Sequence, residues 1–107
     1  MKRYFALAAF AVLAGCSHDT PVPNTPNLDG KCDEVATFDL DFARFDEAAQ
    51  DVAHASGCFV KTETGQTGGI KPNRVKGEMT RREAVQALIQ GTGLKIVNHQ
   101  PDQVTVQ

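Results

Sequence analysis

One stretch of the chain, residues 75–97, constrains the fold most, because it reads as a strand, a capped helix, a glycine stop and a second strand. Thr80 and Glu83 have the spacing of a capping box, in which each side chain accepts a hydrogen bond from the other residue's backbone N–H. Apolar residues then recur at helical spacing on one face, and Gly91 ends the helix; they are Ala84, Val85, Leu88 and Ile89. Such a helix is not stable alone, so the rest of the chain must supply a sheet that buries its apolar face.

An alternating segment at residues 36–42 provides a first strand. Its apolar residues fall on one face, which we expect to be buried (Phe38, Leu40 and Phe42). Asp39 and Asp41 fall on the other face. Paired carboxylates also serve general acid–base catalysis, but on an alternating strand they are more simply the solvated face.

The segments between and after these two units complete the pattern. A helix is predicted over residues 45–56, with Gly57 as its stop and an inward stripe made of Phe45, Ala49, Val52 and Ala53. Residues 58–61 read as a strand and residues 62–73 as a polar, glycine-rich, mobile loop. Residues 94–97 and 104–106 read as the last two strands, joined by a turn around Pro101 and Asp102. The predicted order is βαβ followed by βαββ, which is an α+β fold.

The first fifteen residues, 1–15, are predicted to be a lipoprotein signal peptide. Lys2 and Arg3 form a positive start, and residues 4–13 are apolar but too few to span a bilayer as a mature helix. The run Leu-Ala-Gly-Cys that ends at Cys16 resembles a bacterial lipobox, in which the cysteine thiol accepts a lipid. The alternative is an ordinary signal peptide in which Cys16 is incidental. On the lipoprotein interpretation Cys16 carries acyl chains, more than one of which anchor stably, and Ser17 after it favours the outer membrane.

Residues 16–35 are predicted to be the lipidated cysteine and a proline-rich tether, with prolines at 21, 23 and 26 that favour extended conformations. This tether is either a spacer that lets the domain reach a periplasmic partner or a disordered leader. Without Lys2 and Arg3, 9 basic residues face 13 acidic ones, so the net charge of residues 16–107 is −4. Nucleic acid is therefore not an expected partner.

Residues 36–106 resemble the short N-terminal domain shared by secretins and TonB-dependent signal-transducing receptors. The matching features are a Phe-Asp-Leu strand at 38–40, a helix with Ala48 and Ala49 at its centre that ends in Ser56-Gly57, and the segment Val-Lys-Gly-Glu-Met-Thr at 75–80. The most specific feature is the closing run at 83–94, Glu-Ala-Val-Gln-Ala-Leu-Ile-Gln-Gly-Thr-Gly-Leu. Two departures are a cysteine at position 58, where many relatives carry an aliphatic residue, and a cysteine at position 32 just before the first strand.

The resemblance implies a domain at residues 36–107 in which two helices pack between two small mixed β-sheets. It implies protein–protein contact rather than catalysis, and no enzyme activity is expected. Relatives front much larger proteins, whereas here we expect a stand-alone module on a lipid anchor at the periplasmic face of the outer membrane. Small lipoproteins of type IV secretion systems are the nearest architectural parallel.

The expected partner is therefore an envelope protein, such as a secretin, a secretion-system subunit or a receptor-associated protein, within a secretion, conjugation or transport machine. Docking is expected by strand addition at an exposed sheet edge or through a helix face, with the last hairpin, residues 94–106, as a candidate surface. The alternative function is a signalling module that contacts a periplasmic anti-sigma regulator. A third class, an enzyme or small-ligand binder, would require a well-formed pocket with convergent polar groups.

The cysteines and histidines supply no recognisable catalytic or metal-binding set. With Cys16 acylated, Cys32 and Cys58 remain as an even pair in an oxidising compartment, which favours a disulfide between them. The alternatives are a buried Cys58 with a free Cys32, or an intermolecular bridge. The histidines share no metal-ligand spacing, and His54 near a helix end is more simply a favourable partner of the helix dipole. No metal or cofactor is expected.

Overall fold

A computed structural model describes residues 25–62 and 67–107 of the chain. The predicted signal peptide, the lipidation site Cys16, the tether as far as residue 24 and residues 63–66 of the predicted loop lie outside the described residues. Within the described ranges, no helix has both the length and the apolar character needed to cross a membrane.

The α+β fold class is confirmed, with two helices, two small sheets and the order βαβ-βαββ. After a short 3-10 helix η1 (Lys31–Asp33), the elements are β1 (Val35–Leu40), α1 (Phe45–Ala53), β2 (Phe59–Thr62), β3 (Val75–Thr80), α2 (Arg81–Ile89), β4 (Ile96–Gln100) and β5 (Gln103–Val106). We expected two mixed sheets, but only the three-stranded sheet β2-β5-β4 is mixed, with β2 parallel and β4 antiparallel to β5. The other sheet is the antiparallel pair β1-β3.

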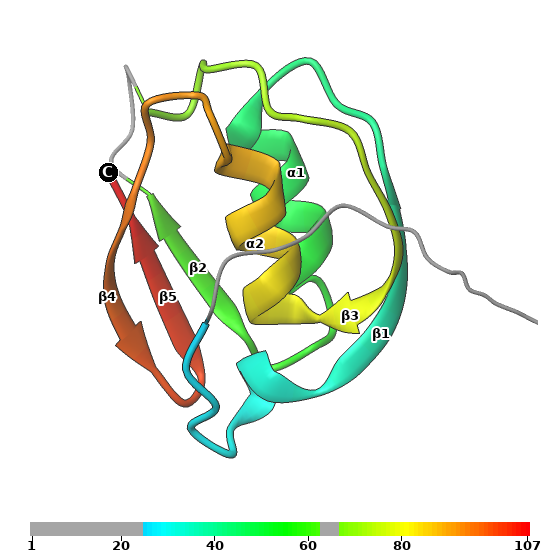
Figure 1. Ribbon diagram of the computed structural model, residues 1–107, viewed down its shortest axis with the longest axis vertical. Coiled ribbons are helices and arrows are strands. Elements are labelled where there is room, and N and C mark those ends of the chain that lie inside the picture. The colour runs from blue at the N-terminus through cyan, green and yellow to red at the C-terminus, as the bar shows by residue number, and fades with distance from the viewer. Residues whose placement is uncertain (1–24, 63–66) are drawn as a thin grey trace, which may run out of the picture.

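The two helices lie between the two sheets, and their apolar faces meet in one core (Figure 1). Phe38 and Leu40 of β1 point into this core as predicted, and Phe42 is half-buried. Asp39 and Asp41 lie on the exposed face, where Arg74 approaches both, at 3.1 and 3.7 Å. Their interpretation as a solvated face is therefore confirmed.

Several element ends differ from the prediction because local side-chain bonds take over the backbone groups. Helix α1 ends at Ala53, three residues early, since Ser56 Oγ donates to the Ala53 carbonyl at 2.9 Å and the chain turns through left-handed residues before β2. Strand β4 begins at Ile96 rather than 94, because the N–H of Leu94 donates to Thr92 Oγ1 in the turn that follows α2. The last turn is shorter than predicted, so residues 98–100 pair with β5.

The predicted disulfide between Cys32 and Cys58 is present, with the two Cα atoms 4.7 Å apart and both side chains buried. The strands that follow these cysteines, β1 and β2, belong to different sheets, so strand pairing does not bring them together. The β4–β5 turn does. The N–H of Cys32 donates to the Pro101 carbonyl at 3.0 Å, and the N–H of Phe59 donates to the Asp102 carbonyl at 2.8 Å. Helix η1, within the predicted tether, is thus part of the folded body.

Candidate functional site

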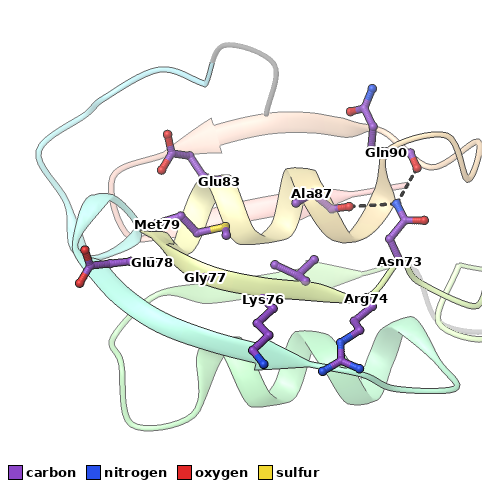
Figure 2. A pocket seen from close by; sticks show the side chains of 10 residues that line it. Asn73, Arg74, Lys76, Gly77, Glu78, Met79, Glu83, Ala87 and Gln90 are labelled. Carbon is purple, nitrogen blue, oxygen red and sulfur yellow. Dashed lines mark hydrogen bonds between the residues drawn. The ribbon is translucent and has the colours of Figure 1, made fainter. Parts of the chain in front are cut away.

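A groove runs between strand β3 and helix α2, with a volume of about 520 Å³ (Figure 2). One wall is β3 and the other is a single face of α2, made by residues spaced three and four apart. The lining residues are Asn73, Arg74, Val75, Lys76, Gly77, Glu78 and Met79 on the strand side and Glu83, Ala87 and Gln90 on the helix side.

Hydrogen bonds fix both ends of the groove. At one end the predicted capping box is present: Glu83 N–H donates to Thr80 Oγ1 at 3.0 Å, and Thr80 N–H donates to Glu83 Oε1 at 2.9 Å. At the other end the amide side chain of Asn73 donates to the carbonyls of Ala87 and Gln90, at 3.0 and 2.6 Å. These carbonyls are among the last of α2, which have no partner within the helix. These hydrogen bonds hold the strand and the helix at a set separation at both ends of the groove.

Among the strands of residues 25–62 and 67–107, none pairs with the edge of β3 that faces the groove. The antiparallel register with β1 continues beyond the strand, where Arg81 N–H donates to the Glu34 carbonyl. Because hydrogen-bonded and non-bonded pairs alternate along an antiparallel ladder, residues 75, 77 and 79 direct their backbone groups toward β1. Lys76 and Glu78 direct theirs away from β1, into the groove. Each offers one donor and one acceptor to an incoming chain.

The side chains of β3 divide between two faces with the period of the strand. Val75 is buried, and Met79 and Gly77 on the same face are half-buried toward α2. Lys76 and Arg74 point the other way, away from α2 (Figure 2). Gly77 has a φ of +137°, and a Cβ atom there would meet only the Met79 methyl, at 3.8 Å. The middle of the groove is therefore apolar and has room.

Most polar side chains around the groove are already engaged. Asn73 bonds the end of α2, Glu83 caps its start, and Arg74 pairs with the carboxylates of β1. The groove thus offers the backbone groups of β3 and, between the polar side chains of Glu83 and Gln90, a small apolar patch made by Gly77, Met79 and Ala87. That combination suits an extended peptide more than a small polar ligand, which needs several convergent side-chain groups.

A buried cluster around Arg82 is the feature that the sequence interpretation missed. The guanidinium is fully buried and donates to both carboxylate oxygens of Asp33, at 2.8 and 3.0 Å, and to the Gln100 carbonyl at 2.8 Å. Its Nη1 lies 3.0 Å from His99 Nδ1. A guanidinium only donates, so Nδ1 must accept and the proton of the neutral ring sits on Nε2. No spacing in the sequence marks this cluster, because its members come from η1, α2 and β4.

These contacts shift two pKa values. The hydrogen bond from Arg82 lowers the pKa of Asp33 against the opposing effect of burial, and the N–H groups of Gly30 and Leu28 add to the lowering. Burial, followed by the Arg82 charge, lowers the pKa of His99, and Asp33 opposes this. Arg82 is bound to Asp33, to the Gln100 carbonyl and to His99 Nδ1, so we interpret the cluster as a structural connection between η1, α2 and β4.

The other predicted positions lie apart from the groove. The disulfide joins Cys32 of η1 to Cys58 just before β2, and neither cysteine lines the groove. His54 is the C-cap residue of α1. Among residues 25–62 and 67–107, no three histidine, cysteine, aspartate or glutamate side chains gather where they could hold a metal ion. The last hairpin, proposed as a docking surface, keeps the outer edge of β4 open within the three-stranded sheet, and its turn is occupied by η1.

A scan against protein-family models finds no matching family, and searches of curated proteins and of solved structures find no match to this chain.

Proposed function

We propose that this protein is a lipid-anchored module of the bacterial cell envelope that binds an extended segment of another envelope protein in the β3–α2 groove. The single observation that carries the proposal is the edge of β3 that no strand of the described residues pairs with, beside a groove whose middle is lined by Gly77, Met79 and Ala87. Two features of the sequence support a place in the cell envelope. One is the lipobox-like run that ends at Cys16, and the other is the resemblance of residues 36–106 to the short N-terminal domain of secretins and TonB-dependent receptors.

The physical case rests on strand addition. An incoming strand would bond to the backbone of Lys76 and Glu78, and its inward side chain would lie over Gly77, Met79 and Ala87. Open sheet edges recruit strands, and proteins usually block the edges that must stay single. Here α2 borders the edge without filling the space beside it, so the groove accepts one chain and limits further growth of the sheet.

In-cell photo-crosslinking tests the proposal on the full-length protein. A photo-reactive amino acid at position 76 should give a crosslink to an envelope protein, identified by mass spectrometry. The same group at Lys61, which is exposed on β2 in the other sheet, should not. A partner from a secretion, conjugation or transport machine supports the main function, whereas a periplasmic anti-sigma regulator would favour the signalling alternative.

A proline substitution separates strand addition from other contacts. Lys76→Pro removes an N–H that points into the groove and makes no bond to β1, so the domain should keep its fold, as edge strands tolerate proline there. The crosslink, placed in this variant at position 78, should be lost, while Lys76→Ala should keep it. A Lys76→Pro protein that melts normally and still crosslinks would refute strand addition.

The lipid anchor is tested separately with the variant Cys16→Ala. Equal membrane association of the wild type and Cys16→Ala would refute the anchor.

A further inference from the structure

Resting on the function proposed above, we infer that the β3–α2 groove selects a segment that runs antiparallel to β3 and carries the order basic–aliphatic–acidic. The aliphatic residue lies opposite Gly77, the basic residue opposite Glu78 and the acidic residue opposite Lys76.

The direction follows from the sheet that would be extended. Strands β1 and β3 already form an antiparallel pair, and a third antiparallel strand keeps the sheet of one type. Antiparallel pairing is slightly more stable per residue than parallel pairing, and sheets of a single type are over-represented. The segment would therefore enter beside Glu78, near the start of α2, and leave beside Asn73.

The order of residue types follows from the faces of β3. Directly opposite residues point to the same face of a sheet. A residue opposite Gly77 would point toward α2, into the space left by the missing side chain and bounded by Met79 and Ala87. Residues opposite Lys76 and Glu78 would point to the solvated face beside these side chains.

The charges on that face are available for recognition. Arg74 is held by Asp39 and Asp41, and Asp39 is the β1 neighbour of Lys76. Lys76 and Glu78 are exposed, and neither is in an ion pair within the described part of the chain. Opposite charges placed directly across a strand pair stabilise it, and like charges placed there destabilise it. The pairs with Lys76 and Glu78 therefore distinguish a segment of the order basic–aliphatic–acidic from one of the order acidic–aliphatic–basic.

The occupant is an extended segment of a partner protein and not the β3 edge of a second copy. The run Lys-Gly-Glu at 76–78 has the selected charge order itself, so two β3 edges would match in charge. However, each β3 has α2 beside its open edge, on the same side of the joined sheet. Paired strands lie about 4.8 Å apart, whereas packed helices need about 8–10 Å, so the two copies of α2 would collide. A bare strand has no helix to place there.

Synthetic peptides test this inference on the detergent-solubilised full-length protein. The probes are Ser-Thr-Lys-Val-Glu-Thr-Ser, its charge-exchanged partner Ser-Thr-Glu-Val-Lys-Thr-Ser and the neutral Ser-Thr-Thr-Val-Thr-Thr-Ser, all with blocked ends. Binding is followed by NMR shifts of the backbone amides of residues 76–78. The first peptide should bind about tenfold more tightly than the second, with the neutral peptide between them. The double variant Lys76→Glu with Glu78→Lys should reverse that order, and its melting temperature reports on folding.

Each of the other outcomes would refute a specific part of the inference. Equal binding of all three peptides would refute the charge order and leave strand addition in place. Preference for the second peptide would refute the antiparallel direction. A dimer that dissociates when peptide is added would show that a second copy is the occupant. Absence of any peptide binding would refute the inference. The proposed function would then be tested separately by the crosslink from position 76.

Discussion

The ion pair between Arg82 and Asp33 gives the sharpest test of the physical description. Asp33→Asn keeps the size and shape of the side chain and removes its charge. Arg82 is fully buried, and the Asp33 side chain is only 6% exposed, so water cannot replace the lost interaction. Two of the hydrogen bonds of the guanidinium end on this carboxylate.

Breaking a buried ion pair by removing one partner costs about 3–5 kcal/mol. We expect Asp33→Asn to lower the free energy of unfolding by about 3 kcal/mol, because an asparagine oxygen can still accept from Arg82 and the Gln100 carbonyl still receives its bond. For a domain of this size, each kcal/mol shifts the melting temperature by about 4–8 °C, so the expected decrease is about 12–24 °C. Thermal unfolding followed by circular dichroism, with the disulfide kept oxidised, measures it.

The matched control is Asp39→Asn, which breaks an ion pair of similar length, 3.1 Å, between side chains that are 62% and 55% exposed. It should cost less than about 1 kcal/mol. The cost of Asp33→Asn should also fall sharply in an Arg82→Met background, because there is then no buried cation to leave unpaired. An equal cost in both backgrounds would refute the account of the ion pair.

The same variant has a defined dependence on pH. Because the folded-state pKa of Asp33 lies below its ordinary value of 3.8, its contribution to stability is fully present above that pH and is lost as the pH falls through the folded value. The stability gap between wild type and Asp33→Asn should therefore be constant near neutrality and close below about pH 3.8. A gap that stays unchanged at acid pH would contradict the lowered pKa.

Three further predictions follow from other contacts. Cys32→Ala with Cys58→Ala should lower the free energy of unfolding by about 3.5 kcal/mol, the chain-entropy value for cysteines 26 residues apart, and mass spectrometry of unreduced wild type should find no free thiol at either position. Since the folded-state pKa of His99 is below its ordinary value of 6.5, the free energy of unfolding should decrease as the pH falls from 6.5 through the folded-state pKa. His99→Asn keeps an acceptor for Arg82 but does not titrate, so urea titrations of this variant should not show that decrease. Gly30→Ala should cost more than Gly91→Ala, because a Cβ at position 30 would clash with the Pro101 carbonyl group, whereas at Gly91 nothing lies within 4 Å and the only cost is the left-handed φ, about 1–2 kcal/mol. Similar urea midpoints for the two variants would contradict the close approach of Gly30 to Pro101.

The fold was predictable from the sequence because its signals are local. The capping box of Thr80 and Glu83 and the alternation around Phe38 each act within a few residues, and each is present in the structure. The ends of elements were less predictable. Helix α1 stops at Ala53 because a serine side chain competes for a helix carbonyl, and such competition leaves only a weak mark in the pattern of apolar residues.

The groove and the Arg82 cluster were not predictable, for a different reason. Arg82 sits at the second position of α2, where an arginine is ordinarily solvated, and its burial depends on Asp33, 49 residues away. The free edge of β3 likewise depends on which strands pair, since an antiparallel β1-β3 sheet of only two strands leaves that edge beside α2. Strand order is a property of the whole chain, and no segment carries it.

The first turn of α2 joins these two features. Arg82 points inward to η1, and the next residue, Glu83, forms the capping box of α2 with Thr80, the last residue of β3, at one end of the groove. If the chain is anchored through Cys16 as proposed, tension from the membrane enters the domain just before Cys32. Without further links, this tension would pull β1 away from β3. Strand β3 forms one wall of the groove, and β1 pairs with it. On that proposal, the disulfide would connect the anchored end of the chain to Cys58 just before β2, and the Asp33–Arg82 pair would connect it to α2. A pull on the tether would then act on both sheets and on α2, and not on the β1-β3 pair alone.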